Sequence, residues 1–340
     1  MSPAVPRAPW RKSWRRWLGL VVIVGVVGAG GALLWHGRGG APGFQEFRLP
    51  SGDIPVCIAV SRDGTVWFTL EGSDAIGMLL NGQIRKLSKG ADSIEPLGLA
   101  IDGAGRAWYT EAPKQRISRA SSDGNIASFA LSTPVARLGR LAIAPDGDVW
   151  FAETSLASVT RLKDGRLTRF VLGSLTTTTP VDPAPFGVAV SPDGAVWASL
   201  QNANKLVRIS PDGNKTAFDL PTRGSGLGDV AVGADGAVWF VEVAANKIGR
   251  FVAGRFEEFP VPTRSAGLTA LAVAPDGAAW FTELRGHRLG RVHAGSITEF
   301  ALPRSDARPF GISVDGENNV WYADLSGWLG RLDAARARVR

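Results

Sequence analysis

Seven tryptophans divide most of this chain into repeats of nearly constant length. They are spaced 41, 42, 47, 42, 41 and 41 residues apart, at Trp67, Trp108, Trp150, Trp197, Trp239, Trp280 and Trp321. Each stands in a similar phrase, such as DGAVWFVE at 235–242 followed by NKIGR at 246–250. A unit of this length forms only a small sheet, which cannot bury both of its faces, so the copies must stack on one another. Repeats of this kind, built from short strands, are typical of propeller blades.

Within one repeat, four short apolar runs alternate with turn residues, and none has helical periodicity. In the fourth repeat these runs cover 186–190, 196–200, 206–209 and 216–220, which we name strands a, b, c and d. Asp-Gly pairs separate strands a and b in most repeats, because glycine accepts the positive φ of a tight hairpin. The sequence therefore predicts an all-β, seven-bladed β-propeller with four-stranded blades.

The two ends of the repeated region should complete one blade together. After the seventh strand c only residues 333–340 remain, which leaves the last blade without a strand d. The phrase FQEFRLP at 44–50 resembles ITEFALP at 297–303, which forms strand d of the sixth repeat. We therefore expect the N-terminal strand to be the outer strand of the last blade, because this pairing closes the ring and removes free sheet edges.

The residues before the repeats have the composition of a membrane anchor. Residues 17–35 contain no charged side chain over 19 positions, and residues 1–16 carry five basic residues and no acidic one. By the positive-inside rule we expect a cytoplasmic basic segment at 1–16, a transmembrane signal anchor at 17–35 and a periplasmic or extracellular propeller on the inner or plasma membrane. A cleaved signal peptide is the alternative, but the apolar stretch is long and no clean Ala-x-Ala site follows it. The remaining segments are a linker at 36–43, the propeller at 44–333 and a basic tail at 334–340.

The sequence pI of about 10.0 does not indicate a nucleic-acid-binding protein. Six of the 38 lysines and arginines lie in the first 43 residues and three in the last seven. The remaining 29 basic residues stand against 31 acidic ones, so the propeller has a net charge of about −2. Because no excess of positive charge is available to hold phosphates, we exclude nucleic acid as a partner.

Cys57 is the only cysteine, so an intramolecular disulfide is excluded. It stands in strand a where other repeats have Gly98, Gly187 and Gly311. Reactive cysteines need an exposed, electropositive setting, so this position predicts a buried and unreactive thiol near the axis.

An acidic residue follows the tryptophan by three positions in five repeats, at Glu111, Glu153, Glu242, Glu283 and Asp324. Glu71 stands one place later, and Leu200 is the exception. We expect these acids to stabilise the blades through pairs with cations at the start of strand c, namely Arg116, Lys247 and Arg288. Such cross-strand contacts contribute roughly 0.2–1 kcal/mol each. A metal site built from the carboxylates is the alternative interpretation.

Function is expected on the face that gathers the b–c and d–a connections of all blades, since exposed loops vary freely and carry binding residues. An insertion at 176–183 accounts for the spacing of 47 residues, Leu200 removes the acid nearby, and Arg140 and Trp328 are specific to their blades. The candidate ligand-binding residues of this face are Glu242, Glu283, Arg308, Phe310, Asp229 and Arg137. His287, which replaces the usual Asn or Asp of a b–c turn, is the candidate catalytic base, and Asp324 is the candidate metal ligand.

Several phrases of the repeats resemble the streptogramin B lyase family, also called virginiamycin B lyases. They are WFTE at 280–283, NKIGR at 246–250, ITEF at 297–300 and RPFGI at 308–312, and the similarity extends from Phe44 to about Leu332. The resemblance implies a seven-bladed propeller that opens a cyclic depsipeptide by elimination across its ester. It also implies a histidine base beside a carboxylate-bound Mg²⁺ that polarises the ester carbonyl.

This chain departs from the family where that chemistry is expected. The family's histidines belong to Pro-x-Gly-Ile phrases at the start of strand a, and in the last two blades we assign those places to Leu268 and Phe310. The family's carboxylate two residues before the catalytic histidine corresponds to Arg308, and Asp324 is the acid that remains near the second metal-binding position.

The sequence thus predicts a membrane-anchored binding module for a small molecule, a peptide or a cell-envelope component, without the lyase site. The alternative is an enzyme, either a Mg²⁺-dependent carbon–oxygen lyase with a relocated base or a metal-dependent hydrolase that uses Glu283, Asp324 and His287. A sensor that signals through its membrane span is disfavoured, because the N-terminal segment is too short for a cytoplasmic domain.

Overall fold

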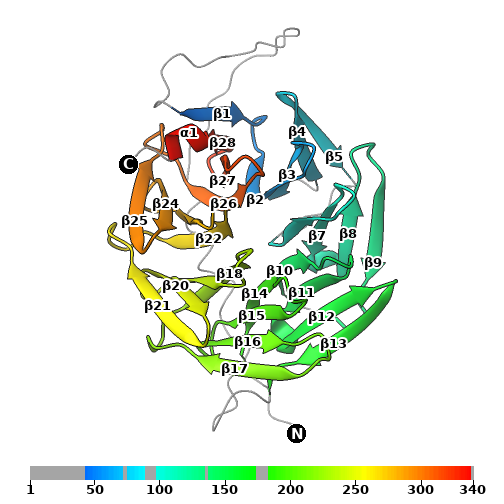
Figure 1. Cartoon of the computed structure of the whole chain (residues 1–340). Coiled ribbons are helices and arrows are strands. Elements are labelled where there is room, and N and C mark those ends of the chain that lie inside the picture. The colour runs from blue at the N-terminus through cyan, green and yellow to red at the C-terminus, as the bar shows by residue number, and fades with distance from the viewer. Residues whose placement is uncertain (1–42, 72–74, 89–96, 135–136, 174–182, 338–340) are drawn as a thin grey trace, which may run out of the picture. The chain divides into compact units, whose positions relative to one another are not determined.

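The computed structural model describes residues 43–71, 75–88, 97–134, 137–173 and 183–337. In this part of the chain, seven four-stranded antiparallel sheets are arranged as a ring (Figure 1). Strand a of each sheet lies nearest the centre and contacts strand a of the next sheet, and strand d lies outermost. The predicted seven-bladed propeller is confirmed.

The strands follow the order a, b, c, d in blades 1 to 6. Their bounds in blades 1 to 3 are β2 (Ile54–Val60), β3 (Val66–Glu71), β4 (Ala75–Leu80), β5 (Gln83–Ser88); β6 (Leu99–Ile101), β7 (Ala107–Glu111), β8 (Arg116–Ala120), β9 (Ile126–Ala130); and β10 (Leu138–Ile143), β11 (Val149–Glu153), β12 (Ser158–Lys163), β13 (Arg166–Val171). Those of blades 4 to 6 are β14 (Pro185–Val190), β15 (Val196–Leu200), β16 (Lys205–Ile209), β17 (Lys215–Asp219); β18 (Leu227–Val232), β19 (Val238–Glu242), β20 (Lys247–Val252), β21 (Arg255–Pro260); and β22 (Leu268–Val273), β23 (Ala279–Glu283), β24 (Arg288–His293), β25 (Ser296–Ala301).

Blade 7 is assembled from both ends of the described chain. It consists of β26 (Pro309–Val314), β27 (Val320–Asp324), β28 (Trp328–Leu332) and, as its outer strand, β1 (Phe44–Arg48). β1 pairs antiparallel with β28, so that Phe44 lies opposite Leu332 and Arg48 opposite Trp328. The predicted closure is confirmed. Short helical segments complete the elements: η3 (Ala112–Lys114), η4 (Thr154–Leu156) and α1 (Ala334–Ala337), the last within the predicted basic tail.

The Asp-Gly turns between strands a and b are fixed by their aspartate side chains. In blade 4, Asp193 accepts hydrogen bonds from Ser191 Oγ and, at 3.1 Å, from the amide of Ala195, while Gly194 has φ +81°. These hydrogen bonds, with that of Ser191 foremost, lower the pKa of Asp193 to about 2. The Asp-Gly motif in the sequence therefore indicates a turn that needs both the aspartate side chain and the glycine backbone.

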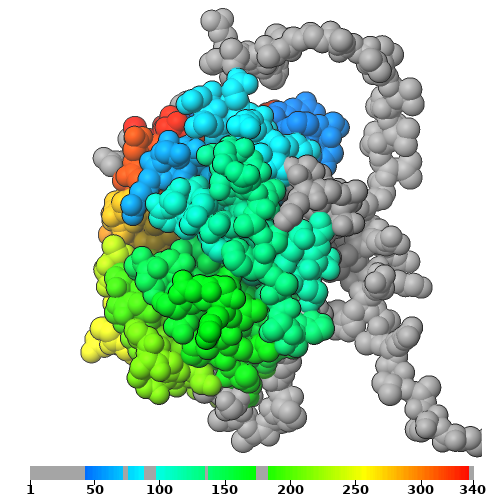
Figure 2. Space-filling view, turned by 90° about the vertical axis from the view of Figure 1, so that its right-hand side faces the viewer, coloured from blue at the N-terminus to red at the C-terminus, as the bar shows by residue number. Residues whose placement is uncertain are grey.

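The blade tryptophans fill the space between neighbouring sheets. Trp67 and Trp280 are almost completely buried, and the latter belongs to a cluster with Tyr322 of the next blade. An arginine of strand c lies opposite the tryptophan of its own blade in most blades. The guanidinium is 5.2–5.7 Å from the indole centroid for Arg119, Arg161, Arg250, Arg291 and Arg331. Figure 2, a view at right angles to Figure 1, shows consecutive blades packed side by side without gaps.

The predictions for the N-terminal segments and for most of the 176–183 insertion concern residues outside the described part of the chain. Among the described residues, no helix is long and apolar enough to cross a membrane. The expected anchor at 17–35 therefore stays a prediction.

Candidate functional site

The b–c turns and the d–a connections lie on one side of the ring, and we call this side the loop face. All candidate residues of the sequence analysis belong to it or to the adjoining start of strand a. In six blades the innermost strand contains a register shift there, for example between Leu227 and Val230 in β18. Such bulges redirect side chains, so the shift decides which residues face the centre of the ring.

The acids that follow the tryptophans are buried at the end of strand b. Two of them pair with an arginine of their own blade, Glu111 with the predicted residue of strand c and Glu153 with a residue of strand d. Glu111 accepts hydrogen bonds from Arg116 at 2.9 and 2.7 Å, as predicted. Glu153 accepts hydrogen bonds from Nε and Nη2 of Arg169, at 2.6 and 3.1 Å, and from the hydroxyl of Thr160 at 2.6 Å. A two-pronged guanidinium contact of this kind satisfies a buried carboxylate.

Glu242 and Glu283 are fully buried, yet neither carboxyl group has a hydrogen-bond partner among the described residues. The predicted ion pairs with Lys247 and Arg288 are wrong, although the predicted register is right, since Glu242 lies opposite Lys247 and Glu283 opposite Arg288. The two cations instead approach a second acid in strand d. Lys247 lies 2.6 Å from Glu258, and Arg288 lies 4.0 Å from Glu299.

Burial raises the pKa of Glu242 and of Glu283 to about 7. The nearby carboxylates of Glu258 and Glu299 add to this rise, because two negative charges in one site repel each other. Glu258 and Glu299 themselves hold the d–a connections, accepting hydrogen bonds from the amide and hydroxyl of Thr222 and of Thr263 respectively. Blades 5 and 6 therefore contain two copies of one acid pair.

Asp324, the candidate metal ligand, is fully buried and its carboxylate is satisfied by protein groups. Arg304 forms a close ion pair with Oδ2, while Oδ1 accepts from the amide of Arg308 at 2.9 Å and from the amide and hydroxyl of Ser326 at 2.8 and 2.7 Å. The same Arg304 guanidinium contacts Glu46 of β1 at 3.2 Å and lies 4.7 Å above the ring of Trp328. A metal ion at Asp324 would have to displace this guanidinium.

His287 and Asp324 bind the same peptide group, the one that joins Ala307 to Arg308. The Nδ1 of His287 donates to the carbonyl of Ala307 at 2.5 Å, and the amide of the next residue, Arg308, is the one that binds Asp324. In a neutral ring this leaves Nε2 as the acceptor. His287 has φ +54°, and Asn204 and Asn246 occupy the same turn position with φ +55° and +56°. These asparagines also bind the neighbouring d–a connection, so the histidine has the structural role of the residue it replaces.

The structure corrects one of the positions carried over from the family, that of Leu268. Leu268 pairs with Glu283 and Pro309 pairs with Asp324, so Leu268 corresponds to Pro309 and Thr269 corresponds to Phe310. Thr269 donates its hydroxyl hydrogen to the carbonyl of Phe310 at 2.8 Å. The assignment of Leu268 was wrong by one residue, since Leu268 and Pro309 both stand 12 residues before the tryptophan of their repeat.

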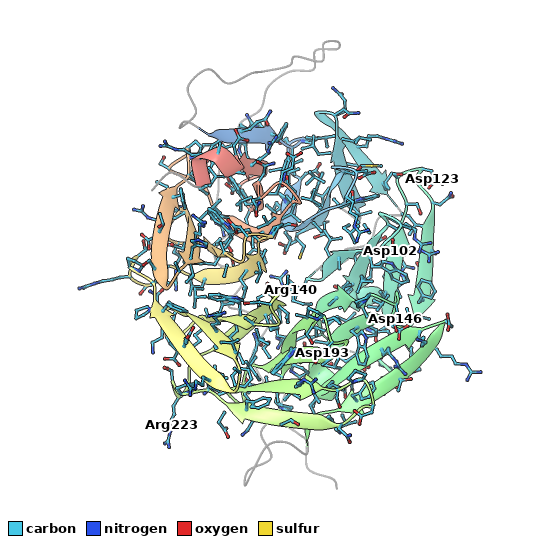
Figure 3. All side chains as sticks on the ribbon, in the orientation of Figure 1. Asp102, Asp123, Arg140, Asp146, Asp193 and Arg223 are labelled. Carbon is cyan, nitrogen blue, oxygen red and sulfur yellow. The ribbon has the colours of Figure 1, made fainter. Side chains whose placement is uncertain are left out.

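Asp229 is in the centre of the ring rather than on the exposed loop face. It forms an ion pair with Arg140 at 3.4 Å, and both side chains are only 11% exposed. Arg140 also donates to Cys57 Sγ and to the carbonyl of Leu97, both at 3.0 Å, and Figure 3 shows it near the middle of the ring. Burial raises the pKa of Cys57 and of Asp229. Cys57 is thus buried as predicted, and the three side chains connect blades 1, 3 and 5 across the axis.

The structure brings some of the predicted residues together and keeps others apart. His287, Arg308 and Asp324 meet at the peptide group between Ala307 and Arg308, whereas Glu242 and Glu283 belong to separate blades and Arg137 is exposed before blade 3. In the described part of the chain, no three His, Cys, Asp or Glu side chains are grouped so that they could hold a metal ion. The Mg²⁺ implied by the resemblance does not fit these residues, because Arg308 and Arg304 supply positive charge where a second carboxylate would be needed.

A hollow of about 480 Å³ opens on the loop face between blades 4 and 5. It is lined by Ala203, Asn204, Asp219, Leu220, Pro221, Arg223 and Gly224. Sequence reasoning missed this hollow and also missed Arg304, Glu258 and Glu299. The repeated Pro-Thr-Arg phrases at 221–223 and 262–264 are a signal that identifies the d–a connections after blades 4 and 5 as copies of one structure.

Comparison with known proteins identifies the relatives of this chain. The Virginiamycin B lyase family matches residues 42–332. A virginiamycin B lyase from Nocardia farcinica is 37% identical over 173 residues, which are 51% of this chain and 57% of that protein. The chain therefore matches less than two thirds of the length of this relative.

Solved structures extend the similarity to the whole propeller. A catalytically inactive histidine-to-alanine variant of virginiamycin B lyase from Staphylococcus aureus, determined with quinupristin, is 30% identical and superimposes with a TM-score of 0.78. The match covers 85% of this chain and 98% of that one. A streptogramin B lyase structure that is 28% identical has the same TM-score and is covered over 96% of its length. This chain belongs to the virginiamycin B lyase family.

Proposed function

We propose that this protein is a ligand-binding propeller of the virginiamycin B lyase family that does not carry out the lyase reaction. The observation that supports this proposal is the ion pair between Arg304 and Asp324. It neutralises the one acid that remains near the family's metal-binding positions, while Arg308 replaces another acid and Phe310 replaces the histidine base. A site with two arginines and no free carboxylate does not attract a divalent cation.

The ligand would bind on the loop face, where the hollow between blades 4 and 5 has a volume in the range of small-molecule sites. Asp219 and Arg223 at its margin offer both signs of charge, and Leu220 and Pro221 offer apolar contact. A small molecule, a peptide or a component of the cell envelope would all satisfy this chemistry.

A lyase or hydrolase with a relocated base is the second candidate, and the tautomer of His287 favours it. Because Nδ1 donates to Ala307, the unprotonated Nε2 is available to accept a proton. The hypothesis needs a substrate that reaches this nitrogen from the loop face, where His287 is exposed.

One experiment separates the two candidates. The full-length protein in detergent is titrated calorimetrically with Mg²⁺, Ca²⁺ and Mn²⁺ and then incubated with quinupristin, and ring opening is followed by mass spectrometry. We expect neither saturable metal binding nor ring opening. Ring opening that is lost in His287→Asn would contradict the proposal, because asparagine retains the backbone contact seen at Asn204 and Asn246 but cannot act as a base.

We also propose that residues 17–35 anchor the propeller in the membrane with residues 1–16 in the cytoplasm. The support is the uncharged run of 19 residues and the basic flank before it. Protease treatment of intact spheroplasts should degrade the propeller and leave a membrane-bound N-terminal fragment. Recovery of the whole protein in the soluble extracytoplasmic fraction would show that the segment is cleaved instead.

A further inference from the structure

Four exposed arginines follow one another around the loop face from blade 5 to blade 7. Arg223, Arg264 and Arg308 stand in three consecutive d–a connections, and Arg285 stands in the b–c turn of blade 6. We call these four residues the arginine arc. Within the described parts of the chain, none of them forms an ion pair, and Arg285 only donates to the carbonyl of Ser265 at 3.1 Å. Figure 3 shows Arg223 near the outer edge of the ring.

Among the described residues, the acids of the loop face do not neutralise the arc. Asp219 pairs with Lys205 at 2.5 Å, and Asp306 pairs with Arg304 at 2.9 Å. Glu71 is exposed without an ion pair, but it lies in blade 1, outside the arc. Four uncompensated positive charges therefore remain on a propeller whose net charge is about −2.

The opposite face contains arginines that are paired and others that are not. Its a–b turns carry aspartates that are matched by arginines of strand c in their own blades. The pairs are Arg208 with Asp193 at 2.6 Å, Arg250 with Asp235 at 3.2 Å and Arg291 with Asp276 at 3.4 Å. These arginines of strand c are thus compensated, but exposed Arg62, Arg166 and Arg255 in other turns of the same face have no ion pair among the described residues. The arc differs from them in that three of its arginines stand on consecutive d–a connections.

The connections that carry Arg223 and Arg264 are held in one fixed form. Each arginine directly follows a threonine whose amide and hydroxyl are bound by Glu258 or Glu299. Asn204 and Asn246 bind the same connections from the preceding b–c turn. A partner would therefore meet guanidinium groups on ordered loops and would not have to order the loops itself.

We propose that the arginine arc is the docking surface for an acidic peptide segment. Guanidinium groups bind carboxylates through two parallel hydrogen bonds, which favours aspartate and glutamate side chains. Val243, 39% exposed between the connections that carry Arg223 and Arg264, and the half-buried Phe310 beside Arg308 add apolar contacts. Alternating charged and apolar positions fit a polypeptide better than a uniformly hydrophilic polymer.

Two other anionic partners are less compatible with the structure. A nucleic acid would extend beyond the arc onto a propeller without excess positive charge. For an anionic membrane, the described chain offers no support at the arc, since β1 begins with Phe44 opposite Leu332, at the end of the blade away from the b–c turns. The chain thus enters the propeller at the face opposite the arc.

The test uses the full-length protein in detergent and a fluorescein-labelled oligo-glutamate peptide, with binding followed by fluorescence anisotropy. We expect saturable binding that weakens as salt is added, and no binding of an oligo-lysine peptide. The double variant Arg223→Ala with Arg264→Ala should bind roughly three- to tenfold more weakly, as the loss of two exposed ion pairs implies. The matched control Arg166→Ala with Arg255→Ala removes two exposed arginines from the opposite side of the ring and should bind like the wild type.

Equal weakening in both double variants would overturn the proposal, because it would show a response to net charge alone. Tighter binding to phosphatidylglycerol vesicles than to the peptide, lost in the arc variant, would also overturn it in favour of a lipid surface. The acidic peptide is a partner for the proposed binding function, and the inference rests on that function. The two proposals are nevertheless refuted by different results. Ring opening of quinupristin would refute the absence of lyase chemistry, whereas peptide binding is measured without that substrate.

Discussion

Two pairs of glutamates at the same position of the blade show how neighbouring side chains decide the state of a buried carboxyl group. Glu111 and Glu153 each face an arginine at hydrogen-bond distance, whereas Glu242 and Glu283 face a second carboxylate. Glu111 and Glu153 are thus paired with a guanidinium group, whereas Glu242 and Glu283 each keep a proton up to about pH 7. The acid therefore occupies the same place in each of these blades, but the charges around it differ from blade to blade.

We predict that the propeller loses stability as the pH rises from about 5 to 8. The folded state holds protons on Glu242 and Glu283 up to a pKa of about 7, while the unfolded chain releases them near 4.5. Between these values the folded state binds more protons, so the free energy of unfolding falls with rising pH. At about 1.4 kcal/mol per pKa unit, reduced by solvent screening, each glutamate should contribute about 1–2 kcal/mol to the loss. Urea unfolding at a series of pH values measures it.

The double variant Glu242→Gln with Glu283→Gln is the control for this prediction, because glutamine has the same shape and does not titrate. We expect its stability to change little over the same pH range and to exceed that of the wild type at pH 8. An unchanged pH dependence in this variant would assign the effect to other groups.

By contrast, Glu153→Gln should destabilise the protein at every pH above the acid range. The substitution leaves the half-buried guanidinium of Arg169 without its carboxylate partner, and removing one side of such a pair costs about 3 kcal/mol. Chemical denaturation at pH 7 tests this value. A loss as small as that of an exposed ion pair would show that solvent already screens the contact.

At the residue scale the sequence predicts positions better than partners. The acids at the end of strand b and their register against strand c follow from the repeat, and the Glu111–Arg116 pair was predicted correctly. The partners of Lys247 and Asp324 were not, because they come from strand d and from a d–a connection. Those contacts depend on side-chain reach in three dimensions, which a one-dimensional repeat does not contain.

The sheet of each blade is built around a compensation of volume between strands b and c. In blade 5 a Cβ on Gly249 would lie 2.0 Å from the ring of the fully buried Phe240, and Gly290 stands in the same relation to Phe281. Blade 4 has the reverse arrangement, in which Val207 lies opposite Ala198. In both blades one residue of the facing pair is large and the other is small. The larger residue stands in strand b of blade 5 and in strand c of blade 4.

We predict that Gly249→Val destabilises the propeller by about 2–3 kcal/mol, as overpacking of a rigid core does. Phe240→Ala alone should cost about 3–5 kcal/mol through the cavity that it leaves. The double variant Phe240→Ala with Gly249→Val reproduces the pair of blade 4 and should recover part of the loss. A double-mutant cycle by chemical denaturation measures the coupling, and simple additivity of the two losses would refute the compensation.

At the element scale the sequence was sufficient for the strands. The four strands of blade 4 were predicted to within one residue of their observed bounds, because turn residues limit each apolar run. The bulge in strand a was not predicted, since it inserts no recognisable residue into the pattern.

The whole ring depends on the strand that the N-terminus contributes to blade 7. β1 covers the outer edge of β28, Phe47 stacks on Trp321 with ring centroids 6.0 Å apart, and Glu46 accepts hydrogen bonds from Arg304 and Tyr322. One strand therefore provides hydrogen bonds, an apolar contact and the counter-charge for the arginine that neutralises Asp324. Closure of the fold and the pairing of the buried Asp324 carboxylate depend on the same network.

We predict that deletion of residues 1–49 abolishes cooperative folding, whereas deletion of residues 1–42 retains it. Both variants lack the expected anchor, but only the first exposes the edge of β28, and a free strand edge pairs with other chains. The shorter deletion should give one sharp thermal transition by circular dichroism and elute as a single species in size-exclusion chromatography. The longer deletion should melt broadly and aggregate, and a peptide of residues 43–50 added in trans should restore part of the sharp transition by refilling the edge. If the longer deletion unfolded as sharply as the shorter one, six complete blades and an open seventh would be sufficient for the fold, and the closing strand would serve only to position Arg304.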